Sequence, residues 1–188
     1  EAKRLDLFTQ YALTAALEAW NDAGVHDGDM DTHRIGVVLG SGMGGLETIC
    51  EQDRLLMAQG AIGVSAMFIP KTIINIAAGN IAIKLSLHGP CYGLVSACSS
   101  GTDAIGHAYY AIKEGRLDGA LTGGTEAVLT NLAIQGFHQM QALSESTDPK
   151  RASIPFDEER QGFVMGEGAS FLFLESEESA KKRNARIY

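Results

Sequence analysis

The chain has few prolines, few cysteines, no long basic run and no long apolar run. Four prolines beside 22 glycines among 188 residues indicate tight turns and close packing between elements, and they argue against a disordered tail. The formal net charge is −8, and Lys181-Lys182-Arg183 is the one basic cluster, so we expect no nucleic-acid partner. No apolar run approaches the roughly 20 residues that span a bilayer, so we expect no membrane segment.

The cysteines are too few and too irregularly spaced for a disulfide framework. They are Cys50, Cys91 and Cys98, and no Cys-x-x-Cys pair indicates structural zinc. The first residues do not resemble a signal peptide. These features favour a reducing compartment, and we expect a cytoplasmic protein.

Segments with strand character alternate with segments of helical periodicity. The pattern predicts helices over 4–23, 46–58, 71–86, 99–114 and 176–183, and strands over 34–39, 91–97, 119–122 and 168–174. We expect a loop over 59–70 and helix or loop between the last two strands. The class is therefore α/β, with a sheet covered on both faces. Residues 185–188 are typical of a strand that is just beginning, and with no initiator Met they indicate part of a longer protein.

The most informative stretch is a strand that ends in Cys98 and leads at once into a helix. Small residues, Ser-Ser-Gly, follow the cysteine and leave room for a bulky thioester. At a helix N-terminus the partial positive charge and the unpaired N–H groups favour the reactive thiolate. The backbone N–H of Cys98 can also face a developing oxyanion. The alternative, a buried inert thiol, stays open on these residues alone. Cys50 and Cys91 have no such context, and we interpret both as structural.

The turn Gly40-Ser-Gly-Met-Gly-Gly45 matches the spacing of a dinucleotide-binding fingerprint. The acidic residue expected about 20 positions further on is missing, since no Asp or Glu lies between Asp53 and Asp103. An apolar helix also replaces the next strand. We therefore interpret the glycines as places where a helix or a substrate chain comes close to the backbone. For Glu126 we expect a structural hydrogen-bonding role, and no pattern of acidic residues indicates a metal site.

Residues 96–101 resemble the nucleophile motif of the chain-elongating β-ketoacyl-carrier-protein synthases, whose fold is the thiolase-like layered α/β/α fold. Further blocks resemble motifs of that family in the same order: 40–45, 68–70, 122–126, 142–144, 155–157, 160–168 and 180–183. Each block alone is weak, whereas the ordered set is specific. The resemblance implies that residues 1–188 are part of the N-terminal half of such an enzyme, without its first strand and its C-terminal half.

The resemblance also implies a reaction. Cys98 would accept an acyl chain from an acyl-carrier-protein thioester, and decarboxylative condensation with malonyl-carrier protein would give a 3-oxoacyl product for fatty-acid biosynthesis. No cofactor is needed. The family's catalytic histidines and lysine belong to the C-terminal half, so we expect the chain alone to be inactive. The histidines present match none of those motifs; they are His26, His33, His88, His107 and His138.

Further site residues follow from the same resemblance. Met43, Phe68 and Phe137 fall where the family lines its acyl pocket, with Phe68 reaching the partner's pocket across a homodimer interface. Plain core packing is the alternative for each. Lys3 and Arg4 fall where the family docks its acidic carrier protein, although a solvated helix end explains them equally well. The remaining docking positions are not basic here: Ile62, Gly63 and Gln141.

Related functions remain open beside this one. A polyketide ketosynthase has the same nucleophile block. A non-catalytic partner of a ketosynthase would have its nucleophile replaced, and Cys98 argues against that. A thiolase would use acyl-CoA and a second cysteine in the C-terminal half, so a requirement for a carrier protein separates the two.

Overall fold

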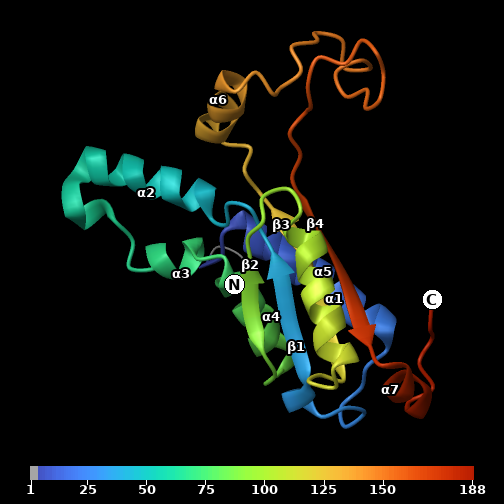
Figure 1. Cartoon of the computed structure of the whole chain (residues 1–188). Helices are drawn as coiled ribbons and strands as arrows, with labels where there is room; N and C mark the ends of the chain where they lie inside the picture. The colour runs from blue at the N-terminus through green and yellow to red at the C-terminus, as the bar shows by residue number, and fades with distance from the viewer. Residues whose placement is uncertain (1–3) are drawn as a thin grey trace.

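The computed structural model describes residues 4–188, which form a four-stranded sheet. Helices cover both of its faces (Figure 1). The strand order is β2-β1-β3-β4. Strand β1 (Ile35–Gly40) pairs in parallel with β2 (Cys91–Leu94) and with β3 (Gly119–Glu126). Strand β4 (Gly168–Glu175) runs antiparallel to β3. The predicted α/β class is confirmed.

The helices follow the predicted alternation, with two additions. They are α1 (Leu7–Ala23), α2 (Leu46–Gln59), α3 (Phe68–Thr72), α4 (Asn75–Leu85), α5 (Ser100–Lys113), α6 (Asn131–Gln139) and α7 (Glu177–Lys182), with 3₁₀ turns at Thr32–Arg34 and Gly60–Gly63. The predicted loop over 59–70 is wrong in part, because it contains a 3₁₀ turn and the start of α3. Within residues 4–188, no helix is both long and apolar enough to cross a bilayer.

The strand expected at 185–188 is also wrong, because these residues are not in a strand. A β-strand is held by ladder hydrogen bonds to a neighbour. Here Tyr188 instead donates its hydroxyl hydrogen bond to Asp22, near the end of α1, at 2.8 Å.

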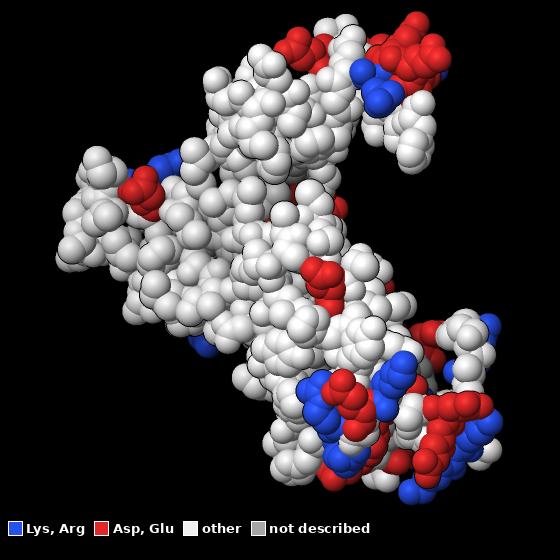
Figure 2. Space-filling model, viewed as in Figure 1, with Lys and Arg blue, Asp and Glu red and all other residues white. Residues whose placement is uncertain are grey.

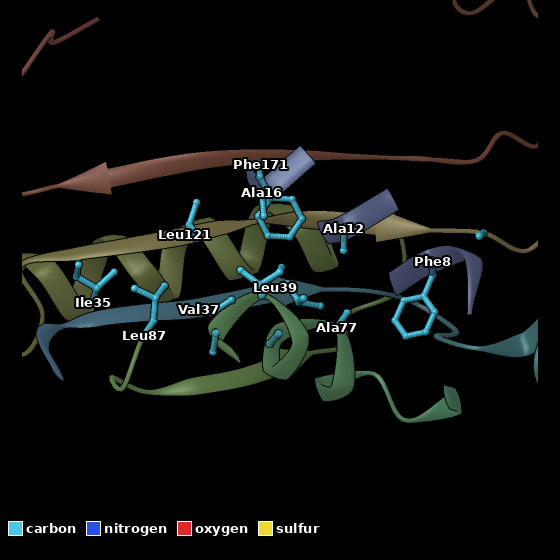
Figure 3. Close-up of a cluster of buried hydrophobic side chains, with 14 residues drawn as sticks. Phe8, Ala12, Ala16, Ile35, Val37, Leu39, Ala77, Leu87, Leu121 and Phe171 are labelled. Atoms are coloured by element: carbon cyan, nitrogen blue, oxygen red, sulfur yellow. The ribbon is translucent and has the colours of Figure 1, made fainter. Parts of the chain in front are cut away.

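Alternate side chains of the central strands enter two separate cores. On one face Ile35, Val37 and Leu39 pack with Phe8 and Ile81, from α1 and α4 (Figure 3). On the other face Val38 and Ala120 pack against the alanines of α5. Strand β1 is buried throughout, as expected for a sheet covered on both faces. Strand β4 is covered less completely, since Phe171 is buried while Leu172, on the opposite face, is exposed.

One buried carboxylate joins the N-termini of two helices. Asp6 accepts the N–H of Phe8 at 3.2 Å and so caps α1. It also accepts the N–H and the hydroxyl of Thr48, at 3.1 and 2.6 Å, in the first turn of α2. Both helix dipoles favour a negative charge there. The start of α1 is thereby fixed at the carboxyl end of the sheet, because α2 begins just after β1.

A buried ion pair lies at the opposite, C-terminal end of α1. Arg183 donates to both carboxylate oxygens of Glu175 at 2.7–3.0 Å, and both side chains are over nine-tenths buried. This bonding raises the pKa of Arg183. The same guanidinium donates to the carbonyls of Ala23 and Gly24 at the end of α1. Residues from β4, α7 and α1 are therefore held by one side chain.

Glycines allow the first turn of α5 to lie directly on the carboxyl ends of β1 and β3. A Cβ on Gly40 would overlap the backbone carbonyl group of Ser100. A Cβ on Gly124 would lie 3.1 Å from the Cα of Gly101. This contact between backbones positions the loop that precedes α5, which contains Cys98.

We expect Gly40→Ala to destabilise the protein by about 3 kcal/mol or more, since the added methyl group meets backbone that cannot rotate away. Gly79→Ala in α4 is the matched control. No atom lies within 4 Å of its added Cβ, and it should stabilise the protein by about 0.5–1 kcal/mol. Denaturant unfolding of both variants measures the difference. Equal stability of the two would contradict the role given to Gly40.

Candidate active site

The structure places Cys98 in a tight turn between β2 and α5. The N–H of Ser99 bonds to the carbonyl of Ser96, and the N–H of Ser100 to that of Ala97, both at 3.2 Å. Ala97 has a φ of 53°, in the left-handed region. For a residue other than glycine this conformation costs about 1–2 kcal/mol, and such strain is frequent at active sites. The strained residue directly precedes the cysteine.

Serine hydroxyls hold this turn together. The buried Ser100 hydroxyl donates to the carbonyl of Ala97 at 2.7 Å and accepts the N–H of Ser96 at 2.9 Å. The Ser99 hydroxyl donates to the carbonyl of Ser96 at 2.9 Å. The turn is therefore braced from within by its own small residues, and Cys98 is left exposed.

The three cysteines differ in their surroundings. Cys98 is exposed and directly precedes Ser99, the N-cap of α5. Part of Cys91 is exposed to solvent, yet the protein around its sulfur raises the pKa of the thiol by burial. Cys50 is half-buried on α2. Of the three, Cys98 is the one that is exposed at the start of a helix.

The glycine-rich turn after β1 is bound by Glu126, at the end of β3. The carboxylate accepts the N–H of Gly42 at 2.6 Å, the N–H of Met43 at 3.3 Å and the hydroxyl of Ser41 at 3.1 Å. The Ser41 oxygen in turn accepts the N–H of Gly44 at 3.0 Å. The structural hydrogen-bonding role expected for Glu126 is confirmed. Consecutive N–H groups of this kind bind phosphate in nucleotide-binding loops, but here they face acceptors of the same chain.

An apolar hollow of about 400 Å³ lies beside this turn, between α2 and α6. Met43 and Phe137 both line it, so the structure brings these two residues together. The other lining residues are Leu46, Leu132, Ala133, Gly136 and Met140. Phe68 does not line the hollow and is half-buried at the start of α3. The sequence predicted either a helix or a loop where α6 lies. Thr130 is a residue type that favours the N-cap position, and the Thr130 side chain accepts the N–H of Ala133 at the start of α6.

Phe163 contacts the wall of the hollow, and it was not among the residues predicted from the sequence. Its ring packs edge-on against Phe137, with centroids 5.5 Å apart. Leu143, just after α6, forms an isolated parallel bridge with Phe163. A segment that precedes β4 is thus joined to the wall of the hollow. The similarity of residues 160–168 to a family motif could have drawn attention to Phe163 from the sequence.

The expected docking residues lie partly outside the described structure. Lys3 is outside the described residues, whereas Arg4 is exposed just before α1. Ile62 and Gln141 are both exposed, and Gly63 is half-buried.

Figure 2 shows charged side chains gathered at two ends of the visible face, with a largely uncharged region between them.

The histidines that lie together are far from Cys98 along the sheet. His33 stacks on His88 with ring centroids 4.9 Å apart. These residues precede β1 and β2, so they lie at the amino ends of parallel strands, while Cys98 follows the carboxyl end of β2. Among residues 4–188, no three His, Cys, Asp or Glu side chains gather as metal ligands would.

The chain belongs to the β-ketoacyl synthase family. The model of the family described as "Beta-ketoacyl synthase, N-terminal domain" matches residues 1–180. Over its whole length the chain is 47% identical to 3-oxoacyl-[acyl-carrier-protein] synthase 2 of Staphylococcus aureus strain N315, of which it covers 45%. It is 42% identical to the Vibrio cholerae protein of the same name, of which it covers 46%. The chain thus spans less than half the length of the curated relatives it matches.

Solved structures agree with this assignment. A β-ketoacyl synthase from Burkholderia phymatum STM815 superposes with a TM-score of 0.88 at 34% identity, over 98% of this chain and 45% of that one. The ishigamide ketosynthase/chain length factor gives a TM-score of 0.88 at 31% identity, over 98% of this chain and 45% of that one. These are ketosynthases of the thiolase-like fold, so the fold expected from the sequence is confirmed.

At neutral pH we expect iodoacetamide to alkylate the exposed Cys98 about tenfold faster than Cys91, because burial raises the pKa of the Cys91 thiol and so lowers its thiolate fraction. Timed quenching followed by peptide mass spectrometry gives the three rates in one sample. Denatured protein is the control, in which the three thiols should react alike. Faster labelling of Cys91 would contradict the expectation.

Proposed function

We propose that the protein carrying this chain is a condensing acyltransferase of fatty-acid biosynthesis. The observation that carries the proposal is the exposed Cys98 in its strained turn at the N-terminus of α5. Support comes from the apolar hollow and from the 47% identity to a 3-oxoacyl-[acyl-carrier-protein] synthase 2. The substrates are acyl and malonyl thioesters of acyl carrier protein.

In the first step the Cys98 thiolate attacks the carbonyl carbon of the acyl thioester. The bond to the carrier sulfur breaks, and the carrier leaves as a thiolate, which takes up the proton that Cys98 lost when its own thiolate formed. The N–H of Cys98 stabilises the oxyanion that forms. In the second step malonyl-carrier protein loses CO₂, and the resulting carbanion attacks the acyl-cysteine. The Cys98 thiolate is released, and the product is a 3-oxoacyl chain longer by two carbons.

The acyl chain lies in the hollow, with Met43 and Phe137 as two of its walls. An apolar lining suits an acyl group, because its burial from water is the main favourable term. We further propose that the protein is a homodimer in which Phe68 contacts the partner's acyl site, and that it is cytoplasmic, in keeping with its free thiols.

The decarboxylation machinery belongs to the part of the protein beyond this chain. The histidines described here lie elsewhere on the sheet or match no family motif, and so the chain alone lacks the histidines and lysine of the second step. We therefore propose that residues 1–188 supply the nucleophile and the acyl site, and that a C-terminal half completes the enzyme.

A polyketide ketosynthase is the second candidate. The complex titled "AntDE:AntF (apo): type II PKS acyl-carrier protein in complex with its ketosynthase bound to the hexaketide" superposes on this chain with a TM-score of 0.87 at 32% identity, covering 96% of this chain and 46% of that one. The higher identity to the fatty-acid enzymes favours the first proposal. Faster turnover of saturated acyl thioesters than of polyketide thioesters would distinguish the two.

In the intact protein, Cys98→Ala should abolish acylation by an acyl-carrier-protein thioester, because within residues 4–188 Cys98 is the thiol that lies at the N-terminus of α5. Intact-mass spectrometry detects a single acyl adduct on the wild type and none on the variant. Cys91→Ala is the matched control and should keep the adduct. An adduct that survives in Cys98→Ala would exclude this cysteine as the acyl acceptor.

If Arg4 helps to dock the carrier protein, Arg4→Glu should raise KM for the carrier thioester about fivefold, with the effect decreasing at high salt. The same acyl group on a short pantetheine thioester should react as before. Arg116→Glu, an exposed arginine that precedes β3 at the opposite end of the sheet, is the control. If Arg4→Glu raised KM equally for the carrier thioester and the pantetheine thioester, Arg4 would not act in docking the carrier protein.

A further inference from the structure

Glu126 binds the glycine-rich turn from a rigid position. It ends β3, a strand paired on both sides. The residue before it, Thr125, is buried and donates its hydroxyl hydrogen bond to the carbonyl of Phe8 at 2.7 Å. The backbone that bears the carboxylate is therefore fixed by the sheet and by α1, whereas the turn that the carboxylate binds lies 84 residues earlier in the chain.

The turn is held at close range. A Cβ on Gly42 would lie 2.8 Å from a carboxylate oxygen of Glu126, so a larger residue there would displace the carboxylate from its present place. The next residue, Met43, donates its N–H to the same carboxylate, and its side chain lines the hollow. The place of the Met43 side chain in the hollow thus depends on the bonds that Glu126 makes.

We propose that Glu126 is a positioning residue that fixes the Met43 turn and thereby sets the length of acyl chain that the hollow accepts. The inference rests on the proposed function, because it takes the hollow as the acyl site. A carboxylate suits this task, since both of its oxygens accept hydrogen bonds and the groups around it are donors. The negative charge strengthens each of these bonds.

Glu126→Gln tests the bonding at nearly constant size. The amide has one acceptor oxygen, and its NH₂ group would face an N–H or a hydroxyl of the turn. We expect the turn to loosen and Met43 to leave its place. In the intact enzyme the ratio of kcat/KM for long against short saturated acyl thioesters should change on the order of fivefold, as is common for residues in contact.

A double-mutant cycle with Met43→Ala separates this role from a general structural one. If Glu126 acts through Met43, Glu126→Gln should no longer change the ratio once the Met43 side chain is removed. Glu114→Gln, an exposed residue paired with Arg116, is the matched control and should leave the ratio unchanged. Ser41→Ala removes one donor from the carboxylate and should give a smaller change in the same direction. It carries the test if Glu126→Gln does not fold.

An equal fall in kcat/KM for every chain length would overturn the inference, as would a change that persists undiminished in Met43→Ala. An unchanged ratio in Glu126→Gln would overturn the inference as well. If the wild type is still acylated at Cys98 in that case, the proposed function stands without the inference. Absence of any acyl adduct on the wild type would overturn the proposed function and this inference together.

Discussion

The close contact between the first turn of α5 and the ends of β1 and β3 is the constraint on which the rest of the site depends. Gly40, Gly101 and Gly124 remove the side chains that would keep helix and sheet apart. The helix N-terminus therefore lies at the edge of the sheet where the chain leaves its parallel strands. Since Cys98 directly precedes that helix, the packing of backbone against backbone decides where the thiol lies.

The parts of the site reach this edge from three connections. The turn that contains Cys98 follows β2, the glycine-rich turn follows β1, and α6 follows β3. Parallel strands bring all three to the same end of the sheet, and residues of the glycine-rich turn and of α6 line one hollow there. Glu126 joins two of these connections directly, and the Phe137–Phe163 contact joins the third to the segment before β4.

The local parts of this arrangement could be predicted from the sequence. The turn at Cys98 was predictable because a strand, a cysteine and small residues at a helix start are neighbours in the chain. The short α3 and α6 were not, since few residues show a periodicity. The partners in the hydrogen bond between Glu126 and Gly42 are 84 residues apart, so the sequence did not predict it. The left-handed backbone of Ala97 was not predictable either, because alanine does not favour that conformation. The alternation of strands and helices was enough for the class, but not for the order of the strands.

The pair formed by Glu175 and Arg183 has a consequence for how relatives of this chain can diverge. Loss of either partner would leave a buried charge without compensation, which costs about 3–5 kcal/mol, whereas apolar residues at both positions can be as stable as the pair. Substitution at one position alone is therefore selected against. Across related sequences the two positions should covary, with the carbonyls of Ala23 and Gly24 finding new donors wherever the arginine is replaced.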